Sequence, residues 1–268
     1  MQVPTAAGQL LLMPAQWGAH VGVKVASVSP SNPTLGLPRI QGLYVLLDSQ
    51  TLSVVTVLDA AELTALRTAA VSALAVDCLA SPSVESLALF GTGPQATSHL
   101  HAIRAIRAIR HVTVHGRTLE RARHFLEEHE LEGTAALVDD GATIDDEIIV
   151  CATGSPTPIL ADVSRVDAVV VAVGSHEPDR RELPGSLVSR SALYVDGLRN
   201  ALTENGNIVM PVSEGAISPD MLVTLSSLVR GEAPRTGGHP ALFLSSGMSW
   251  QDLVVATALS DVDIPESA

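Results

Sequence analysis

The chain has 268 residues, of which 46% are hydrophobic and only 3% aromatic. This length allows one large or two modest domains, with cores built from Ala, Val, Leu and Ile. The 16 basic and 29 acidic residues give a formal net charge of −13, which argues against nucleic acid or an anionic membrane as a partner. We find no signal-peptide pattern and no apolar run of the roughly 18 residues that a membrane helix needs. The expected location is therefore the cytoplasm.

The first part of the chain has the pattern of an antiparallel sheet. Within residues 1–58, short apolar runs alternate with Gly, Pro, Ser and Asn, which is typical of strands and hairpins. Asp59 followed by Glu62 forms a capping-box pattern for a helix over residues 60–79. Ser81-Pro82-Ser83 ends that helix. Cys78 and Cys151 lie in apolar stretches, and we expect both to be buried free thiols.

Residues 87–104 carry the most informative pattern of the chain. An apolar strand leads into a glycine turn and then into a helix-compatible stretch. Gly91 suits the tight turn, Gly93 allows close approach of a pyrophosphate, and Pro94 suits the first helical position. The free N–H groups at such a helix start face an anion. We therefore predict a dinucleotide site at Gly91, Thr92, Gly93, Pro94 and Gln95. The alternative is an ordinary glycine-rich turn between a strand and a helix.

The next apolar alternation, residues 111–115, predicts the second strand of the same unit. An NAD-selective site usually ends this strand with Asp or Glu, which holds the ribose 2′-OH. Here the strand is followed by Gly116, Arg117 and Thr118. A guanidinium and a hydroxyl suit a 2′-phosphate, so we predict NADPH as the cofactor, with NADH possible. The alternative is a solvated Arg117, with Thr118 serving only as the N-cap of a helix over residues 119–128.

The remaining chain continues the succession of strands and helices. Strands are predicted around residues 134–138, 147–151, 168–173 and 193–195, which favours a doubly wound parallel sheet. A helix-like segment covers residues 221–231. A final helix over residues 249–259 is expected to return to the N-terminal β region.

Several segments together resemble the ornithine cyclodeaminase/mu-crystallin family of NAD(P)-dependent imine and amino-acid enzymes. They are LLLMPA, VGVKVASV, LTALRTAAVSALA, LFGTGPQA, GRT, VAVGSHEPDRREL, LYVDG and SSGMSWQD, in that order along nearly the whole chain. The resemblance implies an α/β fold: a Rossmann-type doubly wound parallel sheet, residues 83–245, plus a smaller β-rich domain for substrate binding and dimerisation, residues 1–82 with 246–268. A homodimer is the expected assembly.

The resemblance assigns binding of the substrate carboxylate to Lys24 and Arg67. An α-imino acid carries a carboxylate that must be fixed while hydride reaches the neighbouring carbon, and an ammonium with a forked guanidinium does this well. Lys24 is the only lysine of the chain and lies inside an apolar strand, where a cation is costly unless paired. The alternatives are an outward-reaching Lys24 and a merely salt-bridged Arg67.

The resemblance also places Val173 and Gly174 against the nicotinamide ring and assigns Ser246 and Gly247 to the cofactor. Deaminating relatives carry an aspartate two residues after that glycine, where this chain has His176. The departure favours reduction of a preformed imine over ornithine cyclodeamination. Histidine side chains ordinarily titrate near neutral pH, so His176 could donate a proton, or it is simply a surface histidine.

The predicted function is reduction of a cyclic ketimine acid, Δ1-pyrroline-2-carboxylate or Δ1-piperideine-2-carboxylate, to L-proline or L-pipecolate. The alternatives are an alanine-type dehydrogenase, an ornithine cyclodeaminase and a non-catalytic NADPH-binding protein. No metal site is predicted. A further carboxylate-binding arginine of the family would fall before Met1, so we expect a shortened chain or an upstream start.

Overall fold

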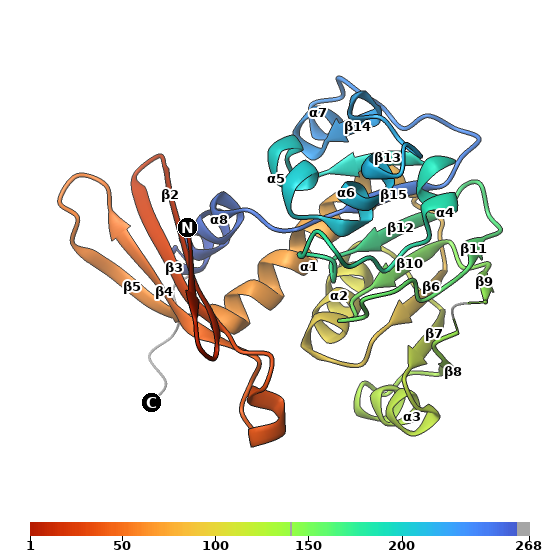
Figure 1. Cartoon of the computed structure of the whole chain (residues 1–268), viewed down its shortest axis with the longest axis horizontal. Helices are drawn as coiled ribbons and strands as arrows, with labels where there is room; N and C mark the ends of the chain where they lie inside the picture. Colours follow the sequence, from red (N-terminus) through yellow and green to blue (C-terminus); the bar gives the residue numbers. More distant parts are fainter. Residues whose placement is uncertain (140, 262–268) are drawn as a thin grey trace. The chain divides into compact units, whose positions relative to one another are not determined.

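The computed structural model describes residues 1–139 and 141–261, which form two compact units (Figure 1). Of the described residues, the first unit comprises 1–68 and 247–261, and the second comprises Ala69–Ser246. Helix α1, Ala60–Leu79, crosses from one unit into the other. The contacts thus divide the chain inside this helix, whereas the sequence-based boundary follows it at residues 82 and 83. None of the described helices combines the length and apolar character needed to cross a membrane.

The first unit is built on a five-stranded antiparallel sheet. Its strands follow one another in chain order: β1 (Gln2–Thr5), β2 (Gly8–Trp17), β3 (His20–Val28), β4 (Ile40–Asp48) and β5 (Val54–Asp59). A short 3-10 helix, η1 (Asn32–Leu35), lies between β3 and β4. Asp59 accepts hydrogen bonds from the N–H groups of Ala61 and Glu62, so it caps α1 as predicted.

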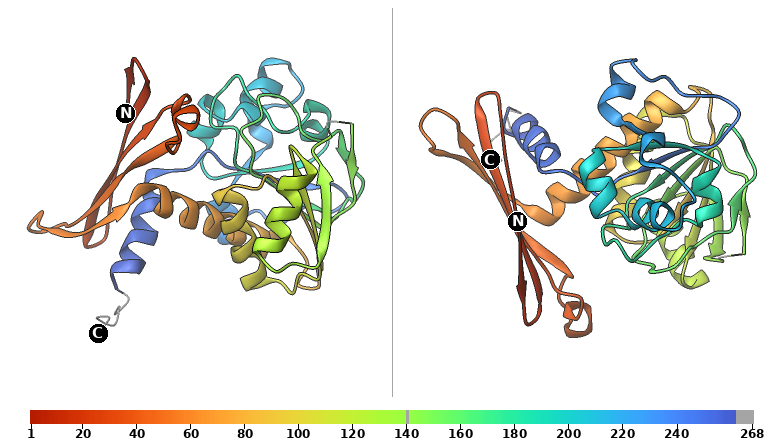
Figure 2. Two further views of the ribbon diagram at one scale, coloured as in Figure 1. Left: turned by 90° about the horizontal axis from the view of Figure 1, so that it is seen from below. Right: turned by 45° about the horizontal axis from the view of Figure 1, so that its top comes forward.

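Helix α8, Ser249–Ser260, packs against one face of this sheet (Figure 2). The final helix therefore returns to the N-terminal β region, as the sequence predicts. A small core joins Tyr44 and Leu46 of β4 with Leu63 of α1 and with Leu253 and Ala256 of α8. Because neighbouring strand residues alternate between faces, Lys24 lies on this covered face.

The second unit is built on an eight-stranded parallel sheet with the order β14-β13-β15-β12-β10-β6-β7-β8. Its strands are β6 (Ser86–Phe90), β7 (His111–Gly116), β8 (Gly133–Leu137), β10 (Ile148–Cys151), β12 (Val169–Ala172), β13 (Ala192–Val195), β14 (Leu222–Thr224) and β15 (Ala241–Leu244). Two short strands, β9 (Thr143–Ile144) and β11 (Asp162–Val163), form a separate pair. The predicted doubly wound parallel sheet is confirmed.

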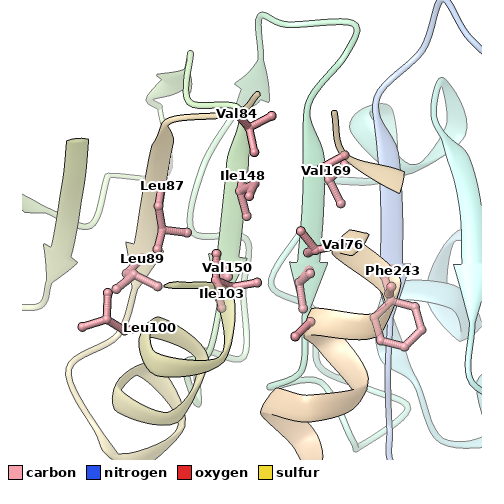
Figure 3. Close-up of a cluster of buried hydrophobic side chains, with 14 of the residues drawn as sticks. Val76, Val84, Leu87, Leu89, Leu100, Ile103, Ile148, Val150, Val169 and Phe243 are labelled. Atoms are coloured by element: carbon pink, nitrogen blue, oxygen red, sulfur yellow. The ribbon is translucent and has the colours of Figure 1, made fainter. Parts of the chain in front are cut away.

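Helices bury both faces of the parallel sheet, as such a sheet requires. They are residues 73–79 of α1 together with α2 (Pro94–Ile106), α3 (Leu119–Glu128), α4 (Gly185–Ser189), α5 (Leu198–Thr203), α6 (Gly206–Ser213) and α7 (Leu225–Val229). The short 3-10 helix η2 (Pro219–Met221) contributes no buried residue. Figure 3 shows one of the two cores, where Leu87 and Leu89 of β6 meet Leu100 and Ile103 of α2. Alternate residues of the same strands, such as Ala88 and Phe90, enter the core on the opposite face.

Three local predictions differ from the structure, and one of them is the central strand β15, which was not predicted. Cys78 is exposed, because it lies on the outward side of α1, whereas Cys151 is buried as expected. The helix-like segment 221–231 contains β14 as well as the short helix α7. Leu222 pairs with Leu193 at the edge of the parallel sheet, so pairing with a distant strand overrides the local helical pattern.

Candidate functional site

The turn between β6 and α2 has the geometry of a dinucleotide-binding turn. Gly91 has a φ of +119°, and a Cβ atom there would lie 2.7 Å from the carbonyl oxygen of Ala152, so only glycine fits. A Cβ atom at Gly93 would meet nothing within 4 Å, which leaves open space beside the helix start. Gly93 is the N-cap of α2, and Pro94 opens the helix as predicted. The helix thus begins with N–H groups available to an anion.

This turn lies where the sheet order reverses. From β6 the chain proceeds to β7 and β8 on one side, while β10 and β12 lie on the other. In open α/β sheets the crevice at the carboxyl ends of the strands, at such a reversal, is where ligands bind. The contact between Gly91, which follows β6, and Ala152, which follows β10, marks this point.

The residues at the end of β7 and just after it include those predicted to bind a 2′-phosphate. The Thr118 hydroxyl accepts a hydrogen bond from the N–H of Arg121 and caps α3. The Arg117 side chain is exposed. Gly116 is buried, and a Cβ atom there would lie 2.8 Å from the carbonyl oxygen of Thr118. Binding of a 2′-phosphate by Arg117 and Thr118 stays a prediction.

Val173 and Gly174 follow β12 at the carboxyl edge of the sheet. The N–H of Val173 donates to the carbonyl oxygen of Cys151 at 3.0 Å. A Cβ atom at Gly174 would lie 1.9 Å from the carbonyl oxygen of Thr153, so the two neighbouring turns touch. His176 is on the surface of this turn, with its side chain 42% exposed and its Nε2 atom 3.9 Å from the Glu177 carboxylate.

The first unit contains a buried cluster of two cations and one carboxylate. The Lys24 ammonium, on β3, lies 2.8 Å from Oδ2 of Asp252 on α8 and donates to Oδ1 at 3.1 Å. The Arg67 Nε atom, on α1, lies 3.3 Å from Oδ1 of the same carboxylate. Asp252 is fully buried, and both cations are almost fully so. The structure thus brings together the two predicted substrate-binding residues.

Further polar groups fix the two cations in place. Lys24 also donates to the hydroxyl of Thr64 at 3.2 Å. Arg67 donates from Nη1 to Oε1 of Gln251 at 3.0 Å, and the same oxygen accepts the N–H of Met248. Sequence reasoning missed Gln251 and Asp252 as partners, although both belong to the SSGMSWQD segment. Their signal was a polar pair on the apolar helix that was expected to return to the β region.

Gly247 lies against the Arg67 side chain. It has a φ of +81°, and a Cβ atom there would lie 2.6 Å from Nη1 and 2.7 Å from Nη2 of Arg67. The structure therefore places Gly247 next to the predicted carboxylate-binding residue. Ser246 is the last residue of the second unit, and at Gly247 the chain re-enters the first unit. Their assignment to the cofactor stays a prediction.

The electrostatics of the cluster favour an added anion. Burial lowers the pKa of the Lys24 ammonium, and the neighbouring Arg67 charge lowers it further, while Asp252 opposes both effects. Two cations share one carboxylate, so a second carboxylate would relieve the repulsion between them. Arg67 forms a salt bridge with Asp252, as one of the alternatives stated. The alternative of an outward-reaching Lys24 is wrong, because its side chain is only 5% exposed. Such a cluster can bind and orient a small acid.

Comparisons with known proteins agree with these features. A Δ1-pyrroline-2-carboxylate reductase from Bacillus cereus is 32% identical over 259 residues, which cover 93% of this chain and 80% of the relative. Ketimine reductase mu-crystallin from Mus musculus is 31% identical over 257 residues, covering 95% of this chain and 80% of the relative. The structure of Thermococcus litoralis Δ1-pyrroline-2-carboxylate reductase in complex with NADH and L-proline has a TM-score of 0.88 and 26% identity, and covers 97% of this chain and 84% of that chain.

The family model itself matches residues 1–263. That span includes the glycine turn after β6, the Lys24–Arg67–Asp252 cluster and the turn after β12. The resemblance seen in the sequence is therefore confirmed: the chain belongs to the ornithine cyclodeaminase/mu-crystallin family.

Proposed function

We propose that this protein reduces a cyclic α-imino acid with NADPH, and that the substrate is Δ1-pyrroline-2-carboxylate or Δ1-piperideine-2-carboxylate. The products are then L-proline or L-pipecolate. The single observation that carries the proposal is the buried pair of Lys24 and Arg67, which share one carboxylate. The names of the relatives from Bacillus cereus and Mus musculus support the same reaction.

In this proposal the two cations bind the substrate carboxylate and so fix the neighbouring imine carbon. The guanidinium of Arg67 offers planar, two-pronged recognition and the Lys24 ammonium a point charge. Asp252 and Gln251 hold both groups in one geometry. Because hydride transfer to an imine carbon depends mainly on approach and alignment, such fixed binding supplies a large part of the catalysis.

The glycine turn supports a nicotinamide cofactor. The open space at Gly93 and the free helix start fit a pyrophosphate bound at residues Gly91–Gln95. Arg117 and Thr118 would receive the 2′-phosphate, and Val173, Gly174 and Ser246 would line the nicotinamide side. When bound, the reduced nicotinamide supplies the hydride. His176 is our candidate for the group that gives the imine nitrogen its proton.

The absorbance of the reduced cofactor tests this function directly. The purified protein is mixed with NADPH or NADH and, in turn, with each of the two cyclic imines and with pyruvate plus ammonia. A separate mixture contains L-ornithine and oxidised cofactor and is followed by ammonia release, because cyclodeamination reduces and then reoxidises the cofactor and leaves its absorbance unchanged. We expect rapid NADPH oxidation with a cyclic imine and slow or no turnover with the other mixtures. Turnover with pyruvate and ammonia alone would instead identify an amino-acid dehydrogenase, and tight NADPH binding without turnover a non-catalytic binding protein.

The uncovered face of the antiparallel sheet supports a homodimer. Its outward residues are apolar on adjacent strands: Val21, Val23 and Val25 of β3, Leu43 and Val45 of β4, and Val57 of β5. Leu43 and Val57 are 54% and 51% exposed, and Val45 pairs with Val57 across the strands. An apolar face of this extent marks an interaction surface. Analytical ultracentrifugation should give a dimer for the wild type and a monomer for the double variant Leu43→Glu with Val57→Glu.

A further inference from the structure

Glu182 is a fully buried carboxylate between β12 and α4 that the reaction described above does not use. Its Oε1 atom accepts two hydrogen bonds from Thr153, one from the backbone N–H and one from the hydroxyl, both at 2.7 Å. Its Oε2 atom accepts the backbone N–H of Gly174 at 2.8 Å. One carboxylate therefore joins two separate turns of the chain.

These two turns occupy equivalent places in the sheet. β10 and β12 are parallel neighbours, with Cys151 opposite Ala172 in the register. Thr153 is the second residue after the end of β10, and Gly174 is the second residue after the end of β12. Both therefore lie at the carboxyl edge of the sheet, where ligands bind in this fold. The turns are in close contact, since a Cβ atom at Gly174 would lie 1.9 Å from the Thr153 carbonyl oxygen.

Glu182 is itself held rigidly. Its backbone N–H donates to the Ser175 hydroxyl at 3.1 Å and to Oδ1 of Asn207 at 3.0 Å. The same Asn207 oxygen accepts the N–H of Leu183. Asn207 of α6 thus helps to hold the backbone of Glu182, while the carboxylate oxygens of Glu182 hold Thr153 and Gly174.

We propose that Glu182 is a positioning residue that sets the spacing of the Thr153 and Gly174 turns and thereby shapes the binding surface for the nicotinamide half of the cofactor. The inference rests on the proposed use of NADPH. Burying a carboxylate is unfavourable unless donors surround it, and here three donors do so. Burial raises the pKa of Glu182, and the hydrogen bonds from Thr153 and Gly174 oppose that rise.

An amide cannot reproduce this arrangement. A glutamine side chain has one acceptor oxygen, and its NH2 group would face an N–H donor of either Thr153 or Gly174. One buried backbone N–H would then lose its partner, and the two turns would separate. Glu182→Gln therefore tests the geometry without changing the size of the side chain. Glu214→Gln is the matched control, because Glu214 pairs with Arg181 at the surface.

The test compares two ligands that differ only in the nicotinamide. Dissociation constants for NADPH and for 2′-phospho-ADP-ribose are measured on the wild type, Glu182→Gln and Glu214→Gln. For Glu182→Gln we expect NADPH to bind about tenfold more weakly, with the affinity for 2′-phospho-ADP-ribose unchanged. The control should match the wild type. Equal weakening of both ligands, or no weakening of either, would overturn the proposal.

Two further measurements keep the inference separate from folding and from the proposed reaction. Thr153→Val removes the hydroxyl, which donates to Glu182 and accepts the N–H of Ser155, and keeps the backbone N–H of Thr153. It should therefore give a smaller loss in the same direction even if Glu182→Gln does not fold. If the wild type binds NADPH but reduces no imine, the proposed function fails while the ligand comparison still decides the role of Glu182. If imine turnover is present, kcat should fall in Glu182→Gln with the KM for the imine unchanged.

Discussion

Lys24 and Asp252 lie 228 residues apart in the sequence and form a fully enclosed ion pair, with Nζ 2.8 Å from Oδ2. The pair connects β3 of the N-terminal sheet to α8, the last helix that the structure describes. Since Arg67 also approaches this carboxylate, Asp252 has two partners to neutralise. The two cations that we propose to bind the substrate, and the packing of α8 on the sheet of the first unit, therefore depend on the same side chain.

Replacing Asp252 by Asn should destabilise the protein strongly. The change keeps the shape of the side chain but leaves two buried cations without their shared counter-charge, a loss of about 3–5 kcal/mol in the free energy of unfolding. Urea denaturation measures it. Glu232→Gln is the control, because Glu232 pairs with Arg230 at the surface, where the two side chains are 54% and 57% exposed; that pair should contribute no more than about 1 kcal/mol. Similar losses in both variants would contradict the assigned role of Asp252.

Truncation of Arg67 should remove transition-state binding. Arg67→Ala is expected to lower kcat/KM for the cyclic imine by an amount equivalent to about 2–4 kcal/mol, because the forked donor to the carboxylate is gone. Lys24 stays paired with Asp252, so the fold should persist. Arg104→Ala, which removes an exposed arginine of α2, provides the comparison. Turnover close to wild type in Arg67→Ala would exclude Arg67 from the substrate site.

A methyl group at Gly247 should displace the Arg67 guanidinium. Gly247→Ala combines an unfavourable backbone conformation at a φ of +81° with a Cβ atom 2.6 Å from Nη1. We expect a rise in the KM for the imine. Gly238→Ala shares the backbone cost, since Gly238 has a φ of +86°, but its Cβ would meet nothing within 4 Å. If the two variants have the same KM, steric pressure on Arg67 is not the cause.

The charge state of Lys24 predicts an alkaline limit to activity. Burial and the Arg67 charge lower the pKa of this ammonium from 10.5. As the pH rises through this lowered pKa, Lys24 loses its charge and binds a carboxylate more weakly. The alkaline decrease in kcat/KM should therefore begin at a pH lower than 10.5. Between the lowered pKa of Lys24 in the folded protein and its ordinary pKa in the unfolded chain, the unfolded chain binds more protons. The contribution of Lys24 to the free energy of unfolding should therefore rise with pH in this range.

Lys24→Arg distinguishes this cause from others. The guanidinium keeps its charge at all accessible pH values, so the alkaline fall in kcat/KM should disappear or move upward in the variant. The full pH profile of both proteins, taken with the same imine, is the measurement. An unchanged alkaline limb would assign it to a group other than Lys24.

Local chemistry explains which features could be predicted. Pro94, Thr118 and Asp59 act through backbone groups within a few residues, so their roles follow from short patterns. The partnership of Lys24 with Asp252 could not be predicted in this way, because it depends on where a distant helix packs. β14 was missed for the same reason: its pairing with β13 at the sheet edge is not local.

The cofactor preference provides the last prediction. Arg117 is exposed just after β7, and Thr118 caps α3. We propose that the Arg117 guanidinium binds the 2′-phosphate. Arg117→Ala should raise the KM for NADPH about tenfold or more, the loss of one charge-assisted hydrogen bond, and leave the KM for NADH unchanged. Arg121→Ala, an exposed arginine on the following helix, should alter neither constant. A wild type that prefers NADH, or an equal effect of Arg117→Ala on both cofactors, would refute selection of the phosphate by Arg117.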